Sequence, residues 1–320
     1  MELTQKKAAW RYRWDRIISR FIHVSAWLSI AIMFLILTFI ARESLPLFYE
    51  KASVDEVGLG RMFLPQNYGT PEAPLAWSWH PVSKEPKYSL MPLILGTLKV
   101  TIIAMLFSIP VSLAAAVYTA EFAPGWLREI LKPAVEFLSG FPSVVLGFFA
   151  LIVLASLVQN IFDFDYRLNA VVAGLALSLA VIPIIYTVCE DAFSSVPRKL
   201  REASWALGAT RAETIVRIVL PAATPGIFAG MVLGFGRAMG ETMIVLMASG
   251  NAAITSLNFA DSTRTLPATI AAELAEVVFG SPHYRVLFFI GLLLFLITFV
   301  MNSVGSHVIS RLRTRLSGES

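Results

Sequence analysis

Two charged residues, Arg237 and Glu241, fall inside an apolar run that is long enough to cross a membrane. A charge at that depth costs about 2.5–3.5 kcal/mol on insertion scales, so neither side chain is expected to face lipid. Residues four apart share one face of a helix and can pair, and the planar guanidinium of arginine can grip an anion through two parallel hydrogen bonds. The pair therefore favours a polar path for a charged substrate, with a structural ion pair as the alternative.

The same run carries glycines that repeat every four residues. Such repeats reduce a helix face to backbone and let neighbouring helices approach closely, so these positions are expected to pack against other spans. The two sets of repeating positions are Gly226, Gly230 and Gly234, and then Gly236 and Gly240.

A polar segment, residues 196–221, separates two apolar runs and predicts two short helices around a turn. Ser195 can cap the first helix, with Pro197 tolerated in its opening turn because the missing N–H has no intrahelical partner there. Gly208 fits the left-handed position that closes this helix. The segment is therefore expected to form a hairpin of helices that bends at Gly208.

The second helix of this hairpin has its own boundary signals. Thr210 and Glu213 have the spacing of a capping box, and Pro221 is expected to stop the helix before the next apolar run. A DNA-reading helix-turn-helix has similar local signals, but one held between membrane spans cannot lie in a major groove, so no nucleic acid is expected as a partner. The first helix has an apolar stripe of Leu200, Ala203, Ser204 and Leu207. Through this stripe the hairpin can bind another protein; the alternative is that it is only a surface hairpin of helices.

Composition makes the chain a polytopic membrane protein. Of its 320 residues 56% are hydrophobic and only 15% are charged, and the mean hydropathy is +0.69, whereas soluble domains are about 25% charged. One cysteine, Cys189, provides no disulfide framework and is expected to be a buried thiol, and no metal or cofactor is expected. The predicted fold is an all-α integral membrane protein with six transmembrane helices, at residues 21–41, 92–120, 133–159, 169–189, 224–249 and 286–309.

The distribution of basic residues predicts the orientation. Outside the spans, sixteen Lys and Arg lie on the side of the N-terminus and eight on the other side, and with Lys99 and Arg237 these account for all 26. Because inner loops carry the excess of Lys and Arg, both termini are predicted to be cytoplasmic. The predicted organisation is a basic amphipathic leader on the inner leaflet (1–20), a first span (21–41), a periplasmic cap (42–91), a five-helix core with a cytoplasmic loop at 190–223 (92–309) and a cytoplasmic tail (310–320).

Several features of the spans and outer segments carry weaker expectations. Residues 42–91 are expected to form an ordered cap on the outer mouth, with a mobile loop as the alternative. Residues 250–285 can hold a short re-entrant helix. Lys99 is expected to snorkel toward the headgroups, and the small and breaking residues at 139–147 indicate an interrupted helix that is either a close-packed kink or part of a pore. Bends are expected at Pro110 and Pro183.

The hairpin resembles the E-A-A-x-x-L-G…I-x-L-P loop of permease subunits of ABC importers. The matching residues are Glu202, Ala203, Leu207, Gly208, Ile218 and Pro221, with Ser204 in place of the second alanine of the pattern. The run Gly236-Arg-Ala-Met-Gly-Glu-Thr-Met243, with Phe141-Pro-Ser-Val-Val145, is similar to the permease subunits of phosphate importers, most of all the C-type subunit. The similarity covers roughly residues 90–310.

The resemblance implies a MetI-like ABC importer permease fold in a bacterial inner membrane. It implies a heterodimer with an A-type permease subunit, two copies of a cytoplasmic ATPase subunit, a periplasmic phosphate-binding protein, and phosphate as the substrate. It also implies that Arg237, Glu241 and Thr242 line the substrate pathway and that the matching hairpin residues couple the ATPase to it.

The residues themselves support this division of labour. The sequence contains no G-x-x-x-x-G-K-[ST] phosphate-binding loop, so the chain is expected not to be an enzyme and ATP hydrolysis is expected to belong to another chain. Alternatives are an ABC permease for sulfate or molybdate, a secondary anion carrier, which typically shows internal repeats that are not found here, and a structural subunit of a membrane enzyme.

Overall fold

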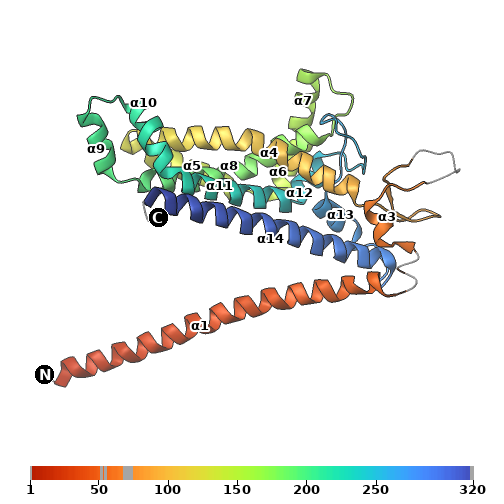
Figure 1. Ribbon diagram of the computed structural model, residues 1–320, viewed down its shortest axis with the longest axis horizontal. Helices are drawn as coiled ribbons and strands as arrows, with labels where there is room; N and C mark the ends of the chain where they lie inside the picture. Colours follow the sequence, from red (N-terminus) through yellow and green to blue (C-terminus); the bar gives the residue numbers. More distant parts are fainter. Residues whose placement is uncertain (1, 51–52, 54–55, 68–74, 318–320) are drawn as a thin grey trace.

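The computed structural model describes residues 2–50, 53, 56–67 and 75–317, and it is an elongated helical bundle (Figure 1). Within these residues, six helical segments are long and apolar enough to cross a membrane, so the predicted number and order of spans are confirmed. The segments are Trp14–Phe48, Met91–Phe122, Ser143–Phe162, Ala170–Ser195, Arg211–Gly240 and Pro282–Leu312.

The first helix, α1 (Glu2–Ser44), diverges from the bundle (Figure 1). The sequence predicted a separate leader and span, but no break divides them in the structure. None of the most apolar window of α1 is buried within this chain. Near its C-terminal end α1 meets α14 (Pro282–Ser317), where the rings of Phe39 and Phe288 pack edge to face at 5.7 Å.

The core of the bundle is formed by α4 (Met91–Val117), α8 (Ala170–Ser195) and α11 (Leu220–Gly240). Small residues let these helices approach closely, because a Cβ at Gly174 of α8 would lie 2.5 Å from Cγ2 of Ile103 in α4. Cys189 is fully buried in this core, as predicted.

Two predicted spans are interrupted in the structure. The span expected at 133–159 is divided into an amphipathic helix α5 (Gly125–Ser139) and a separate membrane segment of α6 (Ser143–Phe149), the π-helical turn η3 (Ala150–Leu154) and α7 (Ala155–Phe162). The break confirms the expected interruption, because Pro142 disfavours a helical residue before it and lacks an N–H. The span expected at 224–249 ends at Gly240, and α12 (Met243–Ala248) follows.

A second, smaller core lies where α13 (Leu266–Glu273) and the start of α14 meet the residues that follow α1. There η1 (Leu45–Phe48), α3 (Leu59–Phe63) and the antiparallel strands β1 (Trp79–His80) and β2 (Lys87–Tyr88) pack against α14 and α13. The described residues of the expected cap form this packed core, while 51–52, 54–55 and 68–74 lie outside the described residues. The helix expected within 250–285 is present as α13. The buried side chains include Leu47, Met62, Trp79, Tyr88, Leu266 and Leu287.

Figure 1 places both marked chain ends at the same end of the long axis as the helices α9 (Arg198–Ala206) and α10 (Arg211–Thr214), and places α3 and the two strands at the opposite end. This is the relative placement that the distribution of basic residues predicted. Which end faces the cytoplasm stays a prediction.

Candidate functional site

The hairpin of α9 and α10 has its bend where the sequence predicted it. Gly208 has a φ of +84°, a left-handed conformation that residues with a side chain rarely adopt. The capping box is also present, since the Thr210 N–H donates to Oε2 of Glu213 at 2.9 Å and the Glu213 N–H donates to Oγ1 of Thr210 at 3.3 Å. The bend and the second helix start are therefore fixed by local chemistry.

Two predicted boundaries of the hairpin are wrong. Ser195 is the last residue of α8 and its hydroxyl donates to the Ala192 carbonyl, while Pro197 itself stands at the N-cap of α9 without a side-chain cap. Pro221 does not stop the second helix. The chain continues from α10 through the π-helical turn η4 (Ile215–Val219) into α11, because a widened turn accommodates the missing N–H and the bulk of the proline ring.

The tip of the hairpin exposes large apolar side chains. Leu207 is 90% exposed, and Leu200 and Trp205 are each 45% exposed. Glu202 and Ala203 are exposed beside them, Pro221 is exposed at the base and Ile218 is half-buried. An exposed apolar stripe on a polar helix is typical of a surface that meets another protein.

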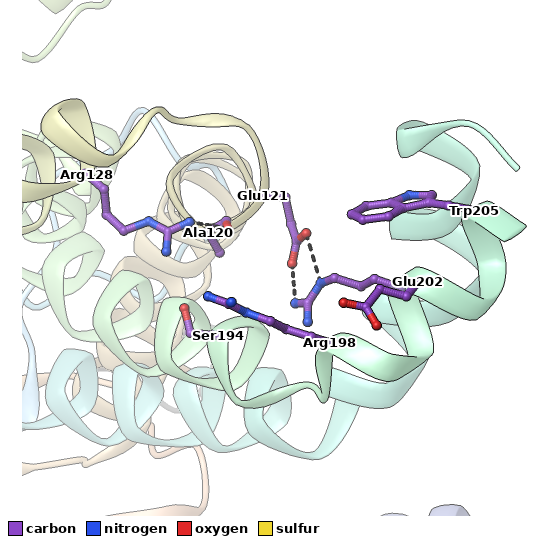
Figure 2. A pocket seen from close by; sticks show the side chains of 8 residues that line it. Ala120, Glu121, Arg128, Ser194, Arg198, Glu202 and Trp205 are labelled. Atoms are coloured by element: carbon purple, nitrogen blue, oxygen red, sulfur yellow. Dashed lines mark hydrogen bonds and ion pairs between the residues drawn. The ribbon is translucent and has the colours of Figure 1, made fainter.

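The base of the hairpin is anchored by buried ionic bonds. Arg201 donates from Nε and Nη2 to the two carboxylate oxygens of Glu121, at 3.2 and 2.5 Å, and the two side chains are 12% and 9% exposed. Glu121 belongs to the π-helical turn η2 (Tyr118–Phe122) that ends α4. A cavity of about 390 Å³ lies at this junction, and Figure 2 shows Glu121 in its middle, with Arg128 on one side and Trp205 on the other.

Arg237 and Glu241 lie together where α11 ends. Their charged groups are 3.6 Å apart, so the expected pairing is confirmed. The two environments differ, because the Glu241 side chain is 6% exposed and that of Arg237 is 50% exposed. Thr242 stands in the break between α11 and α12 and donates to the Gly240 carbonyl at 3.4 Å. The site is thus the open end of an interrupted helix, not the middle of a continuous one as the sequence predicted.

The interrupted helices meet each other. A Cβ on Gly147 of α6 would lie 3.2 Å from the carbonyl oxygen of Met243, the first residue of α12. The break before α6 and the break before α12 therefore belong to one region of the bundle. Irregular backbone at membrane depth is tolerated against protein or along a water-filled path, and this region is where a path for a polar substrate can form.

The glycine repeat lies close against α8 at three of its five positions. Gly226, Gly230 and Gly234 face α8, where added Cβ atoms would lie 2.3 Å from Ala192 Cβ, 3.3 Å from Cys189 Sγ and 2.6 Å from Ile185 Cγ1. Gly240 is a correction, since an added Cβ there meets no atom within 4 Å. The helix ends at Gly240 and its neighbours turn away, so this glycine makes no close helix contact.

Lys99 also differs from its expected position. It does not snorkel but is 6% exposed, and its ammonium donates to the carbonyls of Ser256 at 3.0 Å and Asn258 at 2.6 Å. The partners lie more than 150 positions along the chain, so the sequence carried no sign of them and snorkelling was the expectation. The contact fastens α4 to the segment between α12 and α13.

Sequence reasoning also missed a polar cluster around Glu273. Its carboxylate accepts from Trp79 Nε1 at 3.0 Å and from Arg264 at 2.5 Å, and lies 2.9 Å from Nε2 of His283. Burial on its own would raise the pKa of Glu273, but the hydrogen bonds of His283 and Trp79 and the charge of Arg264 outweigh it and hold this pKa below its usual range. The cluster ties the strand β1 to α13 and the start of α14.

The six long apolar helical segments are those of a multi-pass membrane protein. The family model for the binding-protein-dependent transport system inner membrane component matches residues 108–314, and the chain belongs to this family. This is the family of ABC importer permeases, multi-pass inner-membrane subunits whose ATPase is a separate chain, so the chain is not itself an enzyme. Such a permease works with ATPase subunits and a substrate-binding protein.

Two relatives show the sequence similarity more closely. The chain is 36% identical over 235 residues to a probable ABC transporter permease protein, YqgH, of Bacillus subtilis (strain 168), covering 73% of this chain and 76% of the relative. It is 33% identical over 257 residues to the phosphate transport system permease protein PstC of Mesorhizobium japonicum, covering 74% and 78%.

Solved structures of other importers share the fold. A bacterial ABC transporter involved in the import of the acidic polysaccharide alginate matches with a TM-score of 0.61 and 15% identity, over 93% of this chain and 98% of that one. An inward-facing MetNI methionine ABC transporter matches with a TM-score of 0.56 and 19% identity, over 70% and 95%. The predicted MetI-like permease fold is therefore confirmed.

Proposed function

We propose that the chain is a permease subunit of an ATP-driven phosphate importer and forms half of its translocation pathway. The observation that carries the proposal is the Arg237–Glu241 pair at the break between α11 and α12, with the arginine half-exposed and the carboxylate buried. Named relatives that transport phosphate support the choice of substrate. The other half of the pathway would be an A-type permease subunit, joined by two ATPase subunits and a periplasmic phosphate-binding protein.

The chemistry of the pair suits phosphate. The half-exposed guanidinium of Arg237 keeps donors free for an anion, and its positive charge offsets the cost of moving that anion through a low-dielectric path. The buried carboxylate of Glu241 holds the arginine when no substrate is present. It can also accept a hydrogen bond from the protonated oxygen of phosphate, which fully ionised sulfate cannot donate. Thr242 adds a hydroxyl beside the pair.

The hairpin would be the element that couples ATP hydrolysis to this pathway. Its exposed apolar tip, its fixed bend at Gly208 and its buried anchor to α4 are what a rigid contact with an ATPase requires. The proposal places this hairpin and both termini in the cytoplasm and the 42–91 cap in the periplasm, as the distribution of basic residues predicts.

A test of the site is ATP-driven uptake by the complex reconstituted in vesicles with its ATPase and binding protein. Arg237→Gln is expected to abolish phosphate uptake while the complex still assembles, and Glu241→Gln to lower uptake and weaken discrimination against sulfate. Arg42→Gln, which removes an exposed arginine at the end of α1, is the matched control. Wild-type uptake with Arg237→Gln would exclude the assignment, and loss of the assembled complex would favour a structural ion pair.

A permease for sulfate or molybdate is the second candidate. The similarity to YqgH, a probable permease without a named substrate, leaves room for it, and an arginine in the path would serve any of these oxyanions. The discriminating feature is Glu241, since a carboxylate beside the arginine is useful for an anion that carries a proton and repels one that does not.

A further inference from the structure

The end of α4 nearest the hairpin is held by two arginines. Arg201 of α9 grips Glu121 in η2 and also donates to the carbonyls of Val196 and Phe193 at the end of α8, at 2.5 and 2.8 Å. Arg128 of α5 donates to the carbonyls of Thr119 at 2.9 Å and of Ala120. Because these bonds lie in a largely buried site, a displacement of α9 must carry the end of α4 with it.

The other end of α4 is held by Lys99. Its buried ammonium binds two carbonyls, those of Ser256 and Asn258, in the segment that connects α12 with α13. A further bond strengthens the same end, since Oγ1 of Thr97 accepts from the Leu266 N–H at 2.9 Å. This segment lies toward the end of the bundle that carries the 42–91 cap (Figure 1).

The whole of α4, with Lys99 in its third turn, is one helix of 27 residues, which corresponds to about 40 Å. It packs along α8 over much of that length. Pro110, in the second half of α4, does not leave the helix unsupported, because the hydroxyl of Ser112 donates to the Ile182 carbonyl of α8 at 3.0 Å. The helix is therefore built to move as a unit with its two polar attachments.

We propose that α4 is a strut that links the coupling hairpin to the 250–265 segment, with Glu121 as the positioning residue at one end and Lys99 at the other. The proposal rests on the proposed role of the hairpin as the ATPase contact. Movement of α9 is carried through Arg201 and Glu121 to α4, and through Lys99 to the loop beside the cap. In the opposite direction, a binding protein that shifts this loop alters the position of the hairpin.

The experiment uses the whole complex in vesicles and measures basal ATPase activity and its stimulation by the substrate-loaded binding protein. Stimulation is expressed relative to the basal activity of each variant, and Glu121→Gln and Lys99→Met are each expected to lose about tenfold of it, a typical size for coupling between two sites. The double variant is expected to lose no more than either single variant, because both changes break the same link. Lys132→Gln, which breaks the ion pairs of α5 with Glu190 and Asp191 of α8 but leaves the Arg201–Glu121 and Lys99 contacts in place, is the control.

Stimulation at the wild-type level in either assembled single variant would overturn the proposal. A loss in the double variant equal to the product of the two single losses would also overturn it. If Glu121→Gln does not assemble, Arg201→Lys decides, because it keeps the buried charge but loses the two-pronged grip. Stimulation at the wild-type level with Arg201→Lys would then overturn the proposal, and a loss of about tenfold would support it. Wild type and variants are compared with the same loaded binding protein, so the comparison stays interpretable whichever anion that protein carries, even if the phosphate assignment fails. The hairpin contact is tested separately by measuring whether the ATPase still binds a variant of this chain that lacks residues Leu200–Leu207.

Discussion

Replacing Gly226 with alanine tests how closely α8 and α11 are packed. The added Cβ would lie 2.3 Å from Cβ of Ala192, whereas carbon atoms attract best at about 3.5–4.0 Å. Neither atom is the end of a flexible side chain, so the helices themselves must separate by about 1.2–1.7 Å. That separation would loosen the contacts on either side of the glycine, including those of the buried Cys189.

The magnitude follows from two opposing effects. Overpacking a well-packed core costs about 1–3 kcal/mol, and the severity of this contact favours the upper end. Replacing glycine with alanine inside a helix returns about 1 kcal/mol. A net loss of about 2 kcal/mol is expected for Gly226→Ala. Gly240→Ala meets no neighbour within 4 Å and should be neutral or stabilising by up to about 1 kcal/mol, which makes it the matched control.

The assay is equilibrium unfolding of the purified chain in mixed micelles, followed by far-ultraviolet circular dichroism. Gly230→Ala, whose Cβ would lie 3.3 Å from Sγ of Cys189, should fall between the other two variants. Equal stabilities for Gly226→Ala and Gly240→Ala would refute the close approach of α8 and α11. An order in which Gly240→Ala is the least stable would refute the argument as a whole.

Two further predictions concern the ends of the molecule. Gly208→Val should impair ATPase binding and uptake without preventing insertion, because a β-branched residue at φ +84° costs about 1–3 kcal/mol of backbone strain although no atom blocks its Cβ; normal uptake would contradict a coupling role for the bend. The lowered pKa of Glu273 stabilises the folded chain fully above its ordinary value of 4.5 and progressively less as the pH falls through the folded-state pKa. The thermal unfolding temperature of wild type should therefore fall more in acid than that of Glu273→Gln, and parallel profiles of unfolding temperature against pH would contradict this.

Local chemistry made much of the fold readable from the sequence. Six apolar runs, the left-handed Gly208 and the Thr210–Glu213 box depend on neighbours within a few residues, and all are present in the structure. The glycine repeat predicted a close approach of some neighbouring helix, because spacing alone shows that one face lacks side chains, but only the structure shows that this helix is α8. The Arg237–Glu241 pair belongs to the same class, since four residues separate its members.

What the sequence did not reveal depends on tertiary pairing or on competition between local signals. Arg201 and Glu121 are 80 positions apart, and no pattern in a single sequence indicates that they meet. Pro221 predicted the end of the helix, but the π-helical turn before it accommodates the proline and the helix continues. Apolar composition also merged α5 with the next span, because hydropathy does not register a break of three residues at 140–142.

The most direct test of the central claim is to measure which anion the unmodified complex carries. Vesicles would contain this chain, its partner permease and the ATPase, with ATP on the membrane face that carries the ATPase. The binding protein and labelled phosphate would be added on the opposite face, with sulfate or molybdate as competitor. We predict phosphate uptake that requires both ATP and the binding protein and that excess sulfate does not reduce. Uptake of sulfate or molybdate in preference to phosphate, or phosphate uptake that proceeds without ATP, would contradict the account.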